Sequence, residues 1–103
     1  MKILAISVFE PGKAAEAAKA VDKVISNTPG YKALAMYMCL GNPFPGEIPT
    51  NSMVGLTIAE VEDENALAAV SYPLALAGMR IHRIPILEMK PGKSAETEKK
   101  LKG

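Results

Sequence analysis

Short apolar segments alternate along this chain with amphipathic ones. Four segments are rich in aliphatic side chains and are bounded by glycine, proline or polar residues, and their length predicts β-strands. They are residues 2–9, 31–40, 52–61 and 79–89. Between them, residues 13–27 and 63–77 predict helices. The predicted element order is therefore β-α-β-β-α-β.

Both predicted helices have recognisable ends. The first carries an apolar stripe at i, i+3 and i+4 spacing and stops at residues 27–30, which are Asn-Thr-Pro-Gly. The second begins in an acidic run where Asp63 is a good N-cap, and it ends at Gly78. Pro73 falls inside the second helix, so we expect a kink or a restart there.

Two features mark the edges of the predicted sheet. Residues 41–51 contain three prolines and two glycines, which predicts a long loop and makes it a candidate lid or oligomer contact. Pro85 cannot donate a backbone hydrogen bond, so we expect the fourth strand to lie at a sheet edge or to carry a bulge.

A polar tail, residues 90–103, follows the α+β domain of residues 1–89. The tail repeats an earlier motif, since Pro-Gly-Lys-Ser-Ala-Glu at 91–96 echoes Pro-Gly-Lys-Ala-Ala-Glu at 11–16. Each copy follows a predicted strand. The repeat therefore predicts a short polar helix over residues 94–102.

Alternate residues of a strand face opposite sides of a sheet, which divides the predicted strands into two sets. The even-numbered set is uniformly large and aliphatic, and we expect it beneath the two helices. Its members are Leu4, Ile6, Val8, Leu34, Met36, Met38, Val54, Leu56, Ile58, Ile84 and Ile86. The odd-numbered set is smaller and mostly apolar. Its members are Ile3, Ala5, Ser7, Phe9, Ala33, Ala35, Tyr37, Cys39, Met53, Gly55, Thr57, Ala59, Ile81, Arg83, Pro85 and Leu87.

Two helices can cover only one face of a four-stranded sheet. A second face in contact with water would alternate toward charged residues, and neither face of this sheet does so. An apolar sheet face of this size is an association site. The simplest cover is the same face of a second copy, in a two-fold homodimer that buries about 2,000 Å² or more.

At this point the chain resembles the dimeric α+β barrel superfamily. The resemblance covers residues 1–89 and rests on the element order, the two-faced sheet, Pro73, and the closing strand Arg83-Ile-Pro-Ile-Leu-Glu88. The superfamily includes small quinone-forming monooxygenases, muconolactone-isomerase-like proteins, stress-responsive proteins and prokaryotic families of unknown function. The resemblance implies a ferredoxin-like α+β fold with a four-stranded antiparallel sheet, two copies of which form a barrel. It carries no functional signature.

Composition and charge exclude several classes of function. The net charge is +1, from 12 basic and 11 acidic residues, which argues against a nucleic-acid or anionic-membrane surface. Cys39 is the only cysteine, so we expect neither a disulfide nor a Cys/His metal site. Gly92-Lys93-Ser94 is not a phosphate loop, because Leu87 stands where the first glycine is needed. No cofactor is predicted. The absence of an export signal or spanning segment predicts a cytoplasmic protein.

The odd-numbered face offers a candidate ligand site. Its small residues would leave room between paired sheets, and Ser7, Thr57 and Arg83 would line that space. The simpler interpretation is that small side chains only let the two sheets approach closely. A buried Arg83 would need an acceptor, which could be a ligand anion, Glu60 or Glu88 of either subunit, or solvent at the barrel end.

His82 and Tyr37 are the candidate catalytic residues. His82 is the only histidine, and histidine is the side chain suited to proton transfer near neutral pH. Its even number places it on the helix side, where a structural or surface role is the simpler interpretation. Tyr37 could hydrogen-bond a ligand through its hydroxyl, although an interface aromatic residue is again the simpler interpretation.

Two functions stay open at this stage. The leading hypothesis is a small homodimer that binds a small molecule in the barrel lumen. By resemblance, it could be a cofactor-free oxygenase, isomerase or decarboxylase acting on a small aromatic or keto compound. The alternative is a non-catalytic regulatory or assembly module, in which loop 41–51 and the tail contact other proteins. The position of His82 discriminates between them, because an enzyme needs a proton-handling group in its pocket.

Overall fold

The computed structural model describes residues 1–103, and its elements follow the predicted order. They are β1 (Lys2–Phe9), the 3-10 turn η1 (Pro11–Lys13), α1 (Ala14–Ser26), β2 (Tyr31–Met38), β3 (Met53–Val61), α2 (Glu64–Leu76), β4 (Arg80–Pro85) and α3 (Ser94–Lys102). The four strands form one sheet in the order β2-β3-β1-β4, with every neighbouring pair antiparallel. This arrangement confirms the predicted ferredoxin-like α+β fold.

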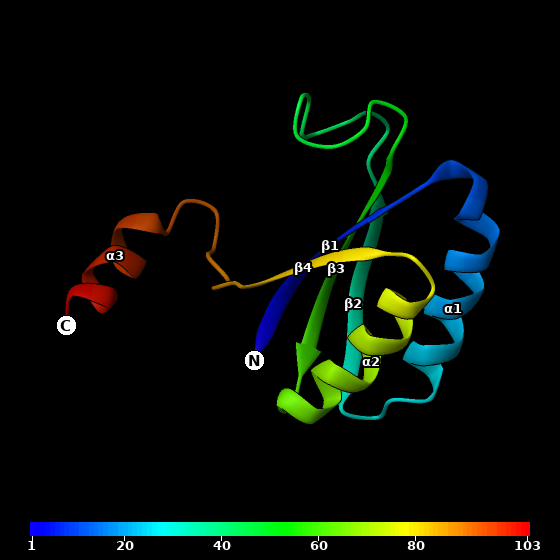
Figure 1. The fold of residues 1–103 in the computed structure, drawn as a ribbon. Coiled ribbons are helices and arrows are strands. Elements are labelled where there is room, and N and C mark those ends of the chain that lie inside the picture. Colours follow the sequence, from blue (N-terminus) through cyan, green and yellow to red (C-terminus); the bar gives the residue numbers. More distant parts are fainter.

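The two central helices lie side by side over one face of the sheet, and the other face carries no helix (Figure 1). β4 is an edge strand that ends at Pro85, as the proline predicts. The strand is shorter than the predicted segment 79–89, because the chain leaves the sheet after Ile86, whose N–H makes the last hydrogen bond to β1. None of the helices has the length and apolar character needed to cross a membrane.

Local hydrogen bonds set the ends of both central helices. The Asp63 carboxylate accepts a hydrogen bond of 2.9 Å from the Ala66 N–H, which confirms the predicted N-cap of α2. At the end of α1, the Asn27 side-chain amide donates to the Lys23 carbonyl at 2.6 Å. α2 continues through Pro73, which sits in its last turn, and Gly78 with a φ of 92° then ends it.

The core lies between the helices and the odd-numbered residues of the sheet. Ile3, Ala59 and Val61 are fully buried there, against Ala17 of α1 and Val70 of α2. The prediction that the large even-numbered residues lie beneath the helices is therefore wrong. Small side chains on both surfaces let the helices approach the sheet closely, so the set with less bulk became the covered one.

A β-bulge reverses the face of the residues that follow it in β2. Ala33 pairs with Ala59, but Ala35 pairs with Ile58, so Leu34 has no partner of its own in β3. After the bulge, Met36 lies opposite Thr57 on the helix-covered face. Tyr37 lies opposite Leu56 on the uncovered one.

Candidate functional site

The face of the sheet that α1 and α2 leave uncovered is called the open face here. Strand register assigns a mostly apolar set of residues to it. Its apolar and aromatic members are Leu4, Ile6 and Val8 of β1, Ala35 and Tyr37 of β2, Val54, Leu56 and Ile58 of β3, and Ile84 of β4, and its polar members are Arg80 and His82 of β4 and, at the end where β1 begins, Lys2, Lys32 and Glu60. Val8 and Val54 are buried at the end next to loop 41–51, while Tyr37 and Ile84 are 60% and 44% exposed. Away from its charged end, the open face is thus an apolar surface that no helix covers.

A cavity of about 970 Å³ lies on the open face, between β4 and loop 41–51, and is called the trough here. Ile6, Val8 and Ile84 line it from the sheet, and Phe44 and Ile48 line it from the loop. Arg80, His82 and Glu47 add polar groups to the same cavity. An apolar cavity with a few polar groups is the usual form of a small-molecule site.

The structure places His82 and Tyr37 on the same face, which the sequence argument did not predict. His82 pairs with Ile6, Ile6 pairs with Leu56, and Leu56 pairs with Tyr37, so one row crosses the open face from edge to edge. Three strand spacings separate the two side chains, or about 14 Å. They therefore share a surface, but they cannot form a hydrogen-bonded pair within one chain. The expected helix-side position of His82 is wrong.

The three predicted ligand-binding residues lie on the other face. Thr57 and Arg83 both pair with Ala5 of the core, and Ser7 pairs with Gly55. The expectation that they line a space between paired sheets is therefore wrong, for the same reason of inverted parity. Arg83 borders the trough through its position on β4, but its charge acts on the helix-covered side.

The charge of Arg83 affects the pKa of Tyr31. Burial raises the pKa of the Tyr31 hydroxyl above its ordinary value, and the nearby Arg83 guanidinium partly opposes the rise. Both residues border a cavity of about 20 Å³ beneath α2. Arg83 forms no ion pair with any carboxylate of the chain.

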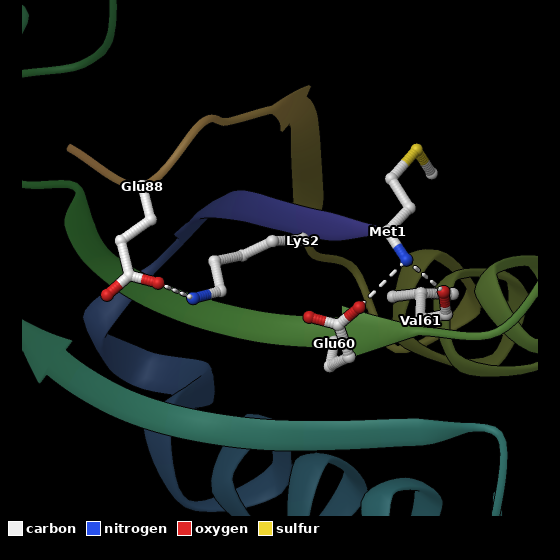
Figure 2. Close-up of polar contacts among 5 residues, drawn as sticks. All are labelled: Met1, Lys2, Glu60, Val61 and Glu88. Carbon is white, nitrogen blue, oxygen red and sulfur yellow. Dashed lines mark hydrogen bonds and ion pairs between the residues drawn. The ribbon is translucent and has the colours of Figure 1, made fainter. Parts of the chain in front are cut away.

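The two carboxylates proposed as partners for Arg83 are engaged elsewhere (Figure 2). Glu60 Oε1 accepts a hydrogen bond of 2.9 Å from the Met1 amine, which also donates to the Val61 carbonyl. This hydrogen bond holds the pKa of Glu60 below its ordinary value. Glu88 Oε2 pairs with Lys2 Nζ at 3.2 Å. Both contacts lie in the solvated region where β1 begins.

A second cavity, of about 340 Å³, lies on the helix-covered side between α1 and the strand edges. Met36, Met38, Met53 and Phe9 line it together with the alanines of α1, and Ser7 borders it. Of the predicted site residues, Ser7 and Tyr37 border this covered cavity. No group of three or more His, Cys, Asp or Glu side chains is placed to hold a metal ion.

Sequence reasoning missed Arg80, Glu47 and Phe44 as trough residues. Arg80 has an even number, so it would have been found had the even set been assigned to the open face. Glu47 and Phe44 lie in loop 41–51, which was singled out as a candidate lid. The sequence of loop 41–51 alone does not indicate on which side of the sheet the loop lies.

No model of a known protein family matches this chain. No curated protein matches it either. Solved structures do. A DUF3240 family protein from Shewanella baltica OS155 is 12% identical, with a TM-score of 0.52 over 86% of this chain and 93% of that one. A dimeric ferredoxin-like protein of unknown function from Jannaschia sp. CCS1 is 16% identical, with a TM-score of 0.52 over 84% and 100%.

A third structure, SnoaB, is a cofactor-independent oxygenase from Streptomyces nogalater. It is 12% identical over 87% of this chain and 97% of that one, with a TM-score of 0.49, which is too low to support an argument about function. At these identities, similarity establishes architecture and not activity. This chain has the ferredoxin-like α+β fold that the Shewanella and Jannaschia proteins also have.

Proposed function

We propose that this protein is a homodimer in which two open faces pair, and that the trough between them binds a small molecule. The observation that carries the proposal is the apolar row that crosses the open face from Tyr37 to His82. Neither helix covers this row, and its edge residue Tyr37 is largely exposed.

Pairing of two open faces follows from the cost of leaving them in water. Each Å² of apolar surface removed from solvent stabilises an assembly by about 25 cal/mol. A second copy brings an identical apolar face, so each chain covers the other in a closed two-fold arrangement. The Jannaschia protein of the same fold is dimeric, which supports a homodimer.

The lining of the trough supports a particular ligand chemistry. Its aliphatic floor suits an apolar body, while Arg80 forms no ion pair in the single chain. Covering the trough with a second copy would remove water from Arg80, and a desolvated guanidinium needs an acceptor. A ligand carboxylate supplies one with matching bidentate geometry. The proposed ligand is therefore a small, largely apolar acid, and His82, which lines the same trough, is the proposed proton-exchange group.

The two arginines of β4 provide a matched test. By strand register Arg80 lies on the open face and Arg83 on the covered face of the same strand, although both border the trough. Thermal melting of the wild-type protein should reveal a stabilising compound in a panel of small aromatic acids and keto acids. A ligand at about 100 times its dissociation constant stabilises by about 2.7 kcal/mol. Arg80→Gln should abolish the shift, and Arg83→Gln should retain it.

Two outcomes would contradict the ligand proposal. One is the absence of any shift across the panel, which would favour the non-catalytic regulatory or assembly module. The other is an equal loss of the shift in both arginine variants. If a binding compound is found, incubating it with wild-type and His82→Ala protein and following its NMR spectrum distinguishes turnover from binding.

A further inference from the structure

We infer that residues 86–102, called the C-terminal arm here, pack against a second copy of this chain and complete the dimer. The inference rests on the proposed homodimer and adds a second contact surface to it. Figure 1 shows the arm leaving the end of β4 and projecting away from α1 and α2, with α3 separated from the rest of the molecule.

The overall dimensions agree with an arm that lacks cover in the single chain. The radius of gyration is 15.4 Å, whereas a closed domain of this length has a value of about 13 Å. The start of the arm is held in place, because the Ile86 N–H donates to the Lys2 carbonyl at 3.1 Å and Glu88 pairs with Lys2. Contacts with Lys2 therefore set the direction of the arm at its start, and the arm leaves the sheet beyond Glu88.

The arm carries large apolar side chains that nothing in the single chain covers. Leu87, Met89 and Leu101 are 61%, 50% and 72% exposed. α3 has only nine residues, and isolated helices shorter than about 12 residues are marginal in water. Its ion pairs, Lys93–Glu96 and Lys102–Glu98, lie in solvent and add little. A packing surface is needed to account for both features.

Area favours a second copy as that surface. Four strands of about eight residues present a projected face of roughly 26 by 19 Å, or about 500 Å² per chain. Two such faces give about 1,000 Å² of projected area, whereas a standard interface buries about 1,600 Å² of accessible surface. The two arms of a homodimer are an additional apolar surface that is available without any other partner.

Substitutions in the full-length chain test the arm by affinity. The triple variant Leu87→Ser, Met89→Ser and Leu101→Ser should raise the dimer dissociation constant at least about tenfold in sedimentation equilibrium. The matched control is Leu76→Ser, which alters an exposed leucine on α2 and should leave the constant unchanged. Circular dichroism checks that each variant is folded.

Paramagnetic labelling tests where the arm lies. Copies with Cys39→Ser and Lys99→Cys carry a nitroxide on α3 and are mixed with ¹⁵N-labelled Cys39→Ser copies. We expect amide signals of the ¹⁵N copies to broaden, because only contact between chains can produce the effect. A nitroxide at Glu16→Cys on α1 is the control and should produce no broadening at the same amides.

The outcomes distinguish the contact made by the arm from the pairing of open faces on which it rests. A wild-type protein that is monomeric at tens of micromolar overturns both. A dimer whose dissociation constant the triple variant leaves unchanged, with no broadening from position 99, overturns the arm alone. A tenfold weaker dimer together with broadening supports both.

Discussion

The guanidinium of Arg83 acts on the buried hydroxyl of Tyr31 across the helix-covered side of the sheet. Burial is the larger effect and raises the pKa of Tyr31, while the positive charge of Arg83 lowers it. The two residues belong to opposite edge strands, β2 and β4. Their coupling indicates that the charge of Arg83 acts on the helix-covered side of the sheet, although Arg83 also borders the trough.

This coupling predicts how stability depends on alkaline pH. Since folding raises the pKa of Tyr31, the folded chain keeps this proton at a pH where the unfolded chain has lost it. The contribution is complete below the unfolded pKa and is lost as pH rises through the folded one. Urea unfolding of the wild type should therefore show stability that falls above about pH 10. Tyr31→Phe should remove this component.

Arg83→Gln provides the second half of the test. Without the positive charge, the pKa of Tyr31 should rise further, which absorbance at 295 nm during an alkaline titration would detect. Arg80→Gln, on the opposite face, should leave the Tyr31 titration unchanged. Equal effects of the two substitutions would contradict the assignment of these side chains to opposite faces.

Deletion of single residues in β2 and β3 tests the bulge. Removing Leu34 joins Ala33 directly to Ala35, so the ladder becomes regular and Tyr37 stays opposite Leu56. We expect a loss of only about 1 kcal/mol in the free energy of unfolding. Removing Ile58 from β3 instead leaves three residues of β2 opposite Thr57 alone and shifts the pairing with β1, so we expect a clearly larger loss. Urea unfolding measures both, and a Leu34 deletion as damaging as the Ile58 deletion would argue against the bulge.

The N-cap of α2 permits a simpler prediction. Asp63→Ala removes the acceptor for the Ala66 N–H and should lower the free energy of unfolding by about 1 kcal/mol. Asp63→Asn keeps a side-chain oxygen in the same place and should retain most of the stability. Chemical denaturation of both variants is the measurement, and two equal losses would mean that the hydrogen bond is not the source of the effect.

The strands and helices were predictable because glycine, proline and capping residues mark their ends. Asp63, Gly78 and Pro85 all do what their chemistry predicts. Which face the helices cover was not predictable in the same way. Both faces are apolar, so hydrophobicity does not distinguish them, and the prediction rests on side-chain size. The alanines of α1 favour the opposite assignment of the two faces, because a small residue such as Ala17 lets the helix pack closely on a small residue such as Ala59.

The same ambiguity between the two faces of the sheet affected the prediction of the site residues. Because the helices cover the odd-numbered residues, His82 of β4 lies on the open face and Arg83 does not. The bulge at Leu34 then moved Tyr37, an odd-numbered residue, onto the even-numbered face. A bulge of this kind has no sequence signal here, since residues 31–38 contain neither glycine nor proline. The loop residues of the trough depend on a long-range fold of loop 41–51, which local patterns do not encode.

The central claim is that two open faces pair, and sedimentation equilibrium tests it most directly. Leu56 lies in the middle of the open face, so Leu56→Lys places a charge within the proposed interface without entering the core beneath the helices. Tyr37→Lys, at the exposed edge, is the milder companion variant. We predict a wild-type dimer at micromolar concentration and folded monomers for Leu56→Lys. A monomeric wild type, or a Leu56→Lys variant that remains dimeric, would contradict the account.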